Sequence, residues 1–143
     1  MPSIRDIIRD ALADINAIEP GDQPTAEDAE DARARLVSMM RGWAADGLTL
    51  TVLDPADGEP VPYSVPDLTL DDAWPLDDSQ VEGVQAMLSV RLSPSFGNQV
   101  GPDLRGRAKV GRRRLNAAYY PEPTISPQGP RTGYGTYRAY RTH

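Results

Sequence analysis

The sequence contains no cysteine, one histidine and one phenylalanine. The absence of cysteine excludes disulfides, thiolate metal sites and cysteine nucleophiles. The histidine is the last residue, His143, so almost every histidine-based mechanism is excluded as well. No stretch approaches the roughly 20 apolar residues of a membrane-spanning helix, and the charged sequence MPSIRDIIRDALADI does not fit a signal peptide. We therefore expect a soluble, non-enzymatic protein that is made in the cytoplasm, does not bind membranes and needs no cofactor.

The chain is long enough for one domain with a modest core. It has 143 residues, of which 39% are hydrophobic, and a domain typically contains about 100–200 residues. Its charge is unevenly distributed, because residues 1–80 carry a net charge of −13 and residues 81–143 one of +7. This asymmetry predicts a basic arm that contacts a polyanion or an acidic protein surface.

A first amphipathic helix is predicted at the N-terminus. Ser3, followed three residues later by Asp6, has the spacing of a capping box. Apolar residues then recur at helical spacing from Ile4 to Ile18. Residues 19–24 contain two prolines and a glycine, which end the helix.

A second helix is predicted from Thr25 to Asp46. Thr25 is a suitable N-cap with Asp28 three residues later, and Gly47 can supply the left-handed residue after the helix. Trp43 lies on the apolar stripe of this helix, where a large aromatic side chain is expected in the core. The two helices are expected to pack antiparallel across their short linker.

An extended insert is predicted after the second helix, over residues 48–76. Residues 48–53 alternate in a pattern typical of a strand, and the rest of the insert is rich in proline and aspartate. Such a long irregular stretch usually forms a functional loop or an element that a partner completes. We expect Leu50, Val52 and Trp74 to contribute to a loop or subunit interface, although the core is an equal alternative for Trp74. The sequence leaves open whether the strand pairs within its own subunit or with a neighbour.

Two further helices are predicted in the C-terminal half. Acidic and capping residues at 77–79 precede a helix that Ser93-Pro94 ends, and Pro102 is a suitable first residue for a helix that continues to residue 118. Outside its apolar positions, this fourth helix carries Arg105, Arg107, Lys109, Arg112, Arg113 and Arg114. A basic helix face either contacts DNA phosphates, or is solvated, or docks an acidic protein patch. The acidic remainder of the chain would repel a duplex.

Residues 119–143 are rich in Pro, Gly, Tyr and Arg and lack apolar periodicity. We predict an extended docking tail, since this composition cannot build a core and tyrosine is enriched where protein surfaces meet. The expected portal- and tail-binding residues are Tyr119, Tyr120, Ile125, Arg131, Tyr134, Tyr137, Arg138, Tyr140 and Arg141. The chain thus divides into a helical core, residues 1–118, and this tail.

The predicted fold is mainly α, a small bundle of about four helices with a long extended insert and an extended tail. We expect no catalytic or metal site. The paired acids 27–28 and 30–31 lie in the first turns of a helix, where the helix dipole favours acids. The acids at 71–72 and 77–78 lack the spacing of a calcium-binding loop.

Two segments resemble the head-to-tail adaptor family of tailed phages, also called head-completion or packaged-DNA-stabilisation proteins. DARARLVSMMRGWAADGLTL, residues 31–50, is similar to the helix of that family that ends in a Trp and a Gly-Leu. VQAMLSVRLSPSFG, residues 84–97, is similar to its third helix with the Pro and aromatic-Gly turn that follow. The similarity covers residues 3–118, including residues 111–115. The proline-rich insert, residues 54–75, and the tail have no counterpart in the pattern.

The resemblance implies a structural virion protein at the neck of the particle, assembled in the host cytoplasm. Copies would form a dodecameric ring under the portal protein, extend the DNA channel, help to retain packaged DNA and provide a platform for the next tail or nozzle protein. Genomic DNA would pass without sequence-specific contact. The alternative is a small nucleic-acid-binding regulator that uses the basic fourth helix, although no helix-turn-helix signature is present.

Overall fold

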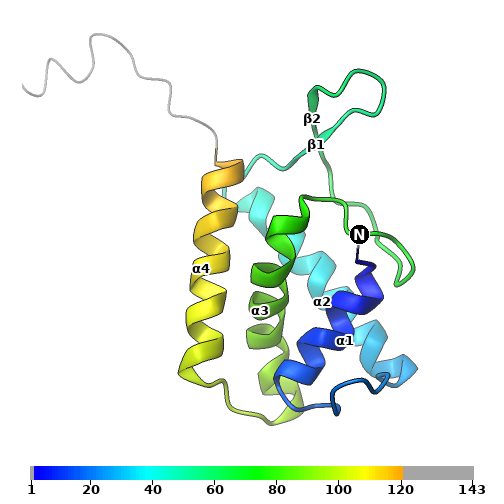
Figure 1. The fold of residues 1–143 in the computed structure, drawn as a ribbon, viewed down its shortest axis with the longest axis vertical. Coiled ribbons are helices and arrows are strands. Elements are labelled where there is room, and N and C mark those ends of the chain that lie inside the picture. Colours follow the sequence, from blue (N-terminus) through cyan, green and yellow to red (C-terminus); the bar gives the residue numbers. More distant parts are fainter. Residues whose placement is uncertain (1, 121–143) are drawn as a thin grey trace, which may run out of the picture.

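The computed structural model describes residues 2–120, and they form a small bundle of four helices with a short hairpin (Figure 1). The mainly helical fold predicted from the sequence is therefore confirmed. The elements are α1 (Ile4–Asp14), α2 (Ala26–Ala45), β1 (Thr51–Leu53), β2 (Pro60–Pro62), α3 (Val81–Leu92) and α4 (Pro102–Tyr119). Two short 3₁₀ turns, η1 (Asp78–Gln80) and η2 (Ser93–Phe96), flank α3.

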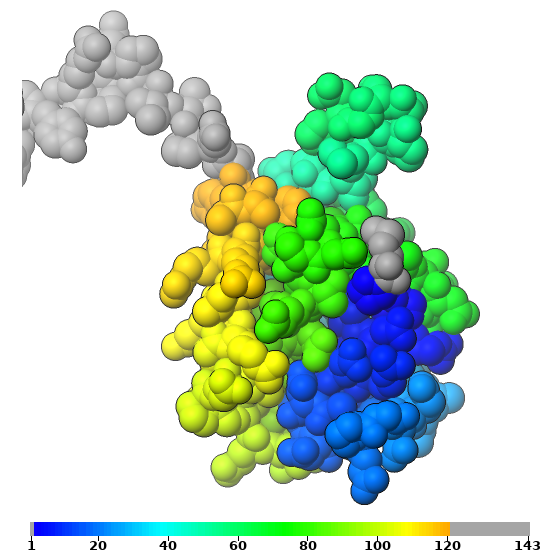
Figure 2. Space-filling view, in the orientation of Figure 1, coloured from blue at the N-terminus to red at the C-terminus, as the bar shows by residue number. Residues whose placement is uncertain are grey.

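Helices α3 and α4 lie side by side and run in opposite directions, and α1 packs against α3. Helix α2 crosses behind α1 and α3 in Figure 1 and contacts both. The hairpin and the C-terminal end of α4 lie at the same end of the bundle. In the space-filling view the hairpin projects beyond the body of the molecule (Figure 2).

The first two helices begin where their capping residues predict. The Ser3 hydroxyl accepts from the Asp6 backbone N–H at 3.2 Å, and the Asp6 carboxylate accepts from the Ser3 backbone N–H at 3.0 Å. These two bonds form the capping box. The pKa of Asp6 is lowered because its carboxylate accepts from the Ser3 backbone N–H and from the Ser3 hydroxyl, which stabilise its ionised form. In the same way the Thr25 hydroxyl accepts from the Asp28 backbone N–H at 3.2 Å. Gly47, with a φ of 96°, follows the end of α2 as predicted.

The core lies between the four helices and is built mainly from leucine and isoleucine side chains. Both tryptophans belong to it: Trp43 is 1% exposed and Trp74 is fully buried. The indole Nε1–H of Trp74 donates to the Asp77 carbonyl at 3.2 Å, so its polar atom is also satisfied. The core position predicted for Trp43 is confirmed. The interface position predicted for Trp74 is wrong, because the insert folds back and buries this side chain within its own subunit.

The extended insert is better paired than the sequence predicted, and its first strand is shorter. Strand β1 begins at Thr51 and pairs with β2 in an antiparallel hairpin of the same subunit, with Val52 opposite Val61. The open question of its pairing is thereby answered. Leu50 precedes the strand and is buried in the core, so its predicted interface role is wrong. Val52 lies in the hairpin and is partly buried.

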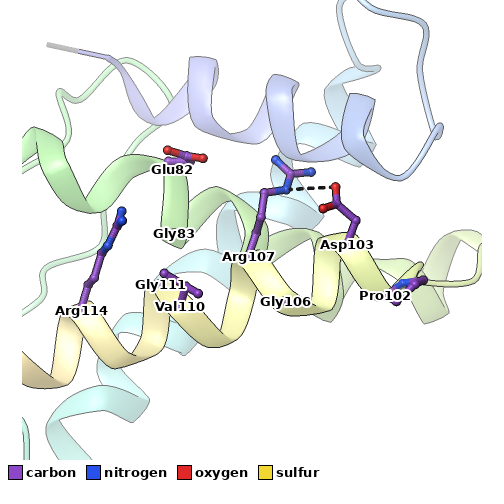
Figure 3. A pocket seen from close by; sticks show the side chains of 9 residues that line it. All are labelled: Glu82, Gly83, Pro102, Asp103, Gly106, Arg107, Val110, Gly111 and Arg114. Atoms are coloured by element: carbon purple, nitrogen blue, oxygen red, sulfur yellow. Dashed lines mark ion pairs between the residues drawn. The ribbon is translucent and has the colours of Figure 1, made fainter.

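Helices α3 and α4 approach most closely where Gly83 faces Gly111 (Figure 3). A Cβ atom added to Gly111 would lie 2.4 Å from the Gly83 Cα, and one added to Gly83 would lie 2.5 Å from the Gly111 Cα. Backbone meets backbone at this crossing, which only a residue without a side chain permits. The glycines therefore set the distance between the two helices.

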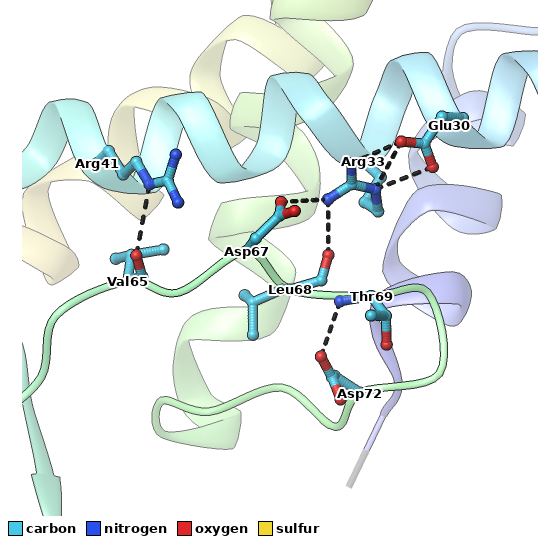
Figure 4. A network of polar contacts seen from close by, with 8 residues as sticks. All are labelled: Glu30, Arg33, Arg41, Val65, Asp67, Leu68, Thr69 and Asp72. Carbon is cyan, nitrogen blue, oxygen red and sulfur yellow. Dashed lines mark hydrogen bonds and ion pairs between the residues drawn. The ribbon is translucent and has the colours of Figure 1, made fainter.

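After the hairpin, the insert returns to the bundle and is anchored by Arg33 of α2 (Figure 4). The Arg33 guanidinium donates to the Asp67 carboxylate and to the Leu68 carbonyl, each at 2.8 Å, and forms an ion pair with Glu30. Both neighbouring carboxylates raise the pKa of Arg33, with the Glu30 hydrogen bond as the larger cause. Arg41 of α2 also donates to the Val65 carbonyl at 3.4 Å, so two arginines attach the returning segment to α2.

The same segment also pairs with the N-terminus. The backbone N–H of Ile4 donates to the Asp72 carbonyl at 2.8 Å, and that of Trp74 donates to the Pro2 carbonyl at 2.9 Å. Because residues 63–76 are held on two sides, the part of the insert that projects from the bundle is the hairpin, residues 51–62.

Candidate docking surfaces

Residues 2–120 include no group of three or more His, Cys, Asp or Glu side chains placed to hold a metal ion. None of the helices in this part of the chain is long and apolar enough to cross a membrane. The surface features of note are a projecting hairpin and hollows beside α4, where another macromolecule could bind.

The first candidate surface is the end of the bundle that carries the hairpin. Leu53 is 68% exposed and Tyr120 is 60% exposed, which is unusual for side chains of this size and apolar character. The Thr49 backbone N–H donates to the Tyr119 carbonyl at 2.8 Å and ties the start of the insert to the end of α4. A hollow of about 580 Å³ separates the hairpin from this end of the bundle, with Leu53, Leu76 and Asp77 among its walls. Apolar side chains and carboxylates are therefore exposed together at this end.

Tyr119 does not begin the tail, because α4 continues through it and its side chain is 8% exposed. Burial raises the pKa of the Tyr119 phenol, and a hydrogen bond with the Asp77 backbone opposes part of that rise. The predicted boundary after residue 118 is thus too early, and Tyr119 belongs to the core. Tyr120 is exposed, as a docking residue must be.

The other predicted tail residues lie outside the part of the chain that the structure describes. They are Ile125, Arg131, Tyr134, Tyr137, Arg138, Tyr140 and Arg141. Their proposed contacts stay predictions.

The basic residues of α4 do not form one face. Arg105, Lys109 and Arg112 line a groove on the α2 side of the helix, whereas Arg107 and Arg114 line a pocket on the opposite flank. Arg113 lines neither and is exposed. The single basic face that the sequence predicted is therefore wrong, because the helical turn places these residues on both sides of the buried stripe.

The groove on the α2 side has an apolar floor and a cationic rim, and we call it the basic groove. It encloses about 400 Å³ between α2, α3 and α4. Its lining is apolar at Met39, Trp43, Met87, Val90 and Ala108, and cationic at Arg91, Arg105, Lys109 and Arg112. The guanidinium of Arg112 pairs with Asp46 at 2.8 Å. The other three cations form no ion pair with residues 2–120 and can therefore take carboxylates from outside the subunit.

The pocket on the opposite flank lies over the glycine crossing (Figure 3). Glu82 of α3 and Arg114 of α4 line it, and Arg107 points toward Asp103. The Arg107 Nε lies 3.8 Å from the Asp103 carboxylate, too far for a hydrogen bond, and has no other polar partner among the described residues. Because acids and bases alternate around this pocket, it favours neither sign of charge.

The sequence patterns did not single out Leu53 or Arg91. Leu53 lies in the predicted strand, and a strand pattern alone does not show which of its side chains is left exposed. Its position next to the turn-forming sequence DPADGE was the available signal. Arg91 belongs to α3 and joins the α4 cations only because the two helices pack together.

No family model matches the sequence, and a search of curated proteins found no match.

Proposed function

We propose that this protein is a head-to-tail adaptor of a tailed phage. It forms a ring under the portal, extends the DNA channel, helps to retain packaged DNA and provides the platform for the next tail component. The observation that carries the proposal is the concentration of docking features at one end of a helical body. The projecting hairpin and the end of α4 lie there together, with Leu53 and Tyr120 exposed.

This arrangement supports an assembly protein for two reasons. Apolar side chains as exposed as Leu53 and Tyr120 gain stability when a partner covers them. The bundle that carries them is closely packed at the glycine crossing, so it can present them in a fixed geometry. The predominance of acids in residues 1–80 also suits a channel wall along which DNA must slide without binding.

The direct test is to mix the full chain with a purified candidate portal ring and to measure the mass of the complex by light scattering. We expect a stoichiometric ring of subunits on the portal. Persistent failure to associate would refute the proposal. A chain that ends at Tyr120 keeps every helix and strand that the structure describes and is expected to lose docking. If it still docks, the predicted role of the tail is wrong.

The nucleic-acid-binding alternative is supported by one observation, the convergence of Arg91, Arg105 and Lys109 on the basic groove. It predicts duplex binding that weakens steeply as salt increases, since each phosphate contact releases counterions. Absence of binding at low salt would eliminate it.

A further inference from the structure

We propose that the tip of the hairpin docks into the basic groove of a second copy of this chain. The contact would join subunits head to tail. It deepens the proposed function, because it names the surfaces through which a ring would form, but it can be tested without a portal.

The hairpin tip, residues 53–59, carries both acidic and apolar side chains, and hydrogen bonds within the hairpin fix its shape. Residues 48–66 contain three acids, Asp54, Asp57 and Glu59, and no Lys or Arg. The Asp54 N–H donates to the Glu59 carbonyl at 2.9 Å, and the Asp57 carboxylate accepts from the Glu59 N–H at 3.0 Å. None of the three carboxylates forms an ion pair within residues 2–120. The exposed side chain of Leu53 lies immediately before them.

The second strand favours docking through side chains rather than through strand addition. The Tyr63 N–H donates to the Leu50 carbonyl, and the Asp54 N–H donates to the Glu59 carbonyl. Hydrogen-bonded pairs recur at every second residue of an antiparallel ladder, so the pair midway between these two, Val52 and Val61, has its N–H groups facing the partner strand. The outward positions of β2 are then residues 60 and 62, both prolines, which have no N–H to donate. The outer edge of β2 therefore has no donor with which to add another strand.

The basic groove has the complementary character. Met87, Val90 and Ala108 are partly buried and leave apolar surface accessible, and Arg91, Arg105 and Lys109 surround it without an ion pair to any acid of residues 2–120. A leucine next to carboxylates fits this surface, with the apolar side chain on the floor and the acids on the rim. Each subunit offers an acidic tip and a basic groove, so in a chain of 1:1 contacts every tip is paired with the groove of the next copy.

The tip and the groove of one subunit cannot meet. Leu53 lies near Tyr119 at the end of α4, whereas the groove is lined by α4 residues 105–112. At about 1.5 Å per residue these positions are roughly 10–20 Å apart along the helix, and the hairpin projects away from the bundle (Figure 2). The contact must therefore come from another copy. Since two different surfaces meet, the interface is heterologous and repeats around a ring or along a filament.

Cysteine cross-linking tests the contact directly, because the natural chain has no cysteine to interfere. A full chain carrying Leu53→Cys is mixed under mild oxidation with one carrying Ala108→Cys, in the groove. The matched control is Val110→Cys, which is more exposed than Ala108 on the same helix but lines the opposite pocket. We expect a heterodimer with Ala108→Cys, at a yield at least about fivefold above that with Val110→Cys and decreasing with salt.

A charge swap supplies a second measurement. Asp57→Lys is expected to lower the cross-linked fraction about fivefold, and Lys109→Asp in the groove-bearing chain is expected to restore it. Equal yields with Ala108→Cys and Val110→Cys, tip-to-tip dimers of Leu53→Cys alone, or no cross-link with or without a portal would each overturn the inference. A ring on the portal without the cross-link refutes only this contact. The cross-link without portal binding refutes only the adaptor function.

Discussion

Alanine at position 111 places a methyl group between two helix backbones that are already in contact. The added Cβ would lie 2.4 Å from the Gly83 Cα and 2.9 Å from the Gly83 carbonyl carbon and oxygen. Carbon atoms normally approach to about 3.5–4.0 Å. Neither side of the contact is a flexible side chain that could rotate away, so α3 and α4 must separate by about 1 Å at their crossing.

The change in the free energy of unfolding follows from two opposing effects. Alanine favours a helix by about 1 kcal/mol relative to glycine, whereas overpacking a core costs about 1–3 kcal/mol, and more where nothing can relax. Because backbone opposes backbone here, we expect overpacking to prevail and Gly111→Ala to reduce the free energy of unfolding by about 2 kcal/mol. For a domain of this size, that corresponds to a decrease in Tm of about 8 °C.

Urea denaturation followed by circular dichroism measures this difference. Gly106→Ala is the matched control, since Gly106 lies in the same helix and its added Cβ would meet nothing within 4 Å. We expect the control to stabilise the protein by up to about 1 kcal/mol. If Gly111→Ala is as stable as Gly106→Ala, the two helices do not touch at this point and the reasoning is wrong.

Four further substitutions have defined outcomes. Arg33→Lys keeps the charge but loses the planar guanidinium that donates to the insert at Asp67 and at Leu68. We expect limited proteolysis to cleave the insert faster, while the far-UV circular dichroism spectrum stays unchanged. An unchanged cleavage rate would show that other contacts hold the insert. Hydrogen bonds from Ser3 lower the pKa of Asp6, so the stability that the Asp6 carboxylate contributes is fully present above the ordinary carboxyl pKa, near 4, and is lost as the pH falls below that value. Asp6→Asn should therefore flatten the dependence of the free energy of unfolding on pH in this acidic range. A dependence identical to that of the wild type would contradict this expectation. Trp74→Phe removes the hydrogen bond to the Asp77 carbonyl and leaves a small cavity, so we expect the free energy of unfolding to decrease by about 1–3 kcal/mol. Tyr120→Ser, at an exposed site, should leave the free energy of unfolding nearly unchanged.

The helices could be read from the sequence because their signals are local. Ser3 and Thr25 begin α1 and α2 by hydrogen bonds to residues three positions later, and Pro102 begins α4 with a ring already shaped for a first turn. Trp43 could be assigned to the core because helical periodicity fixes which face of α2 it shares.

Part of the fold and most of the candidate site depended on contacts between distant residues. Trp74 lies in a part of the insert without periodicity, and the return of that part to α2 and to the N-terminus buries it. Which cations of α4 line the basic groove and which line the opposite pocket depends on which flank of the helix faces α2.

The sequence by itself therefore determined the number of helices, where each begins and the excess of acid in the first half. Capping, periodicity and charge are properties of neighbouring residues. The tertiary structure alone decided that Gly83 meets Gly111, that Arg91 joins Arg105 beside an apolar floor, and that Leu53 is left uncovered. These features arise from residues far apart in the chain, and the packing of whole helices sets the distances between them.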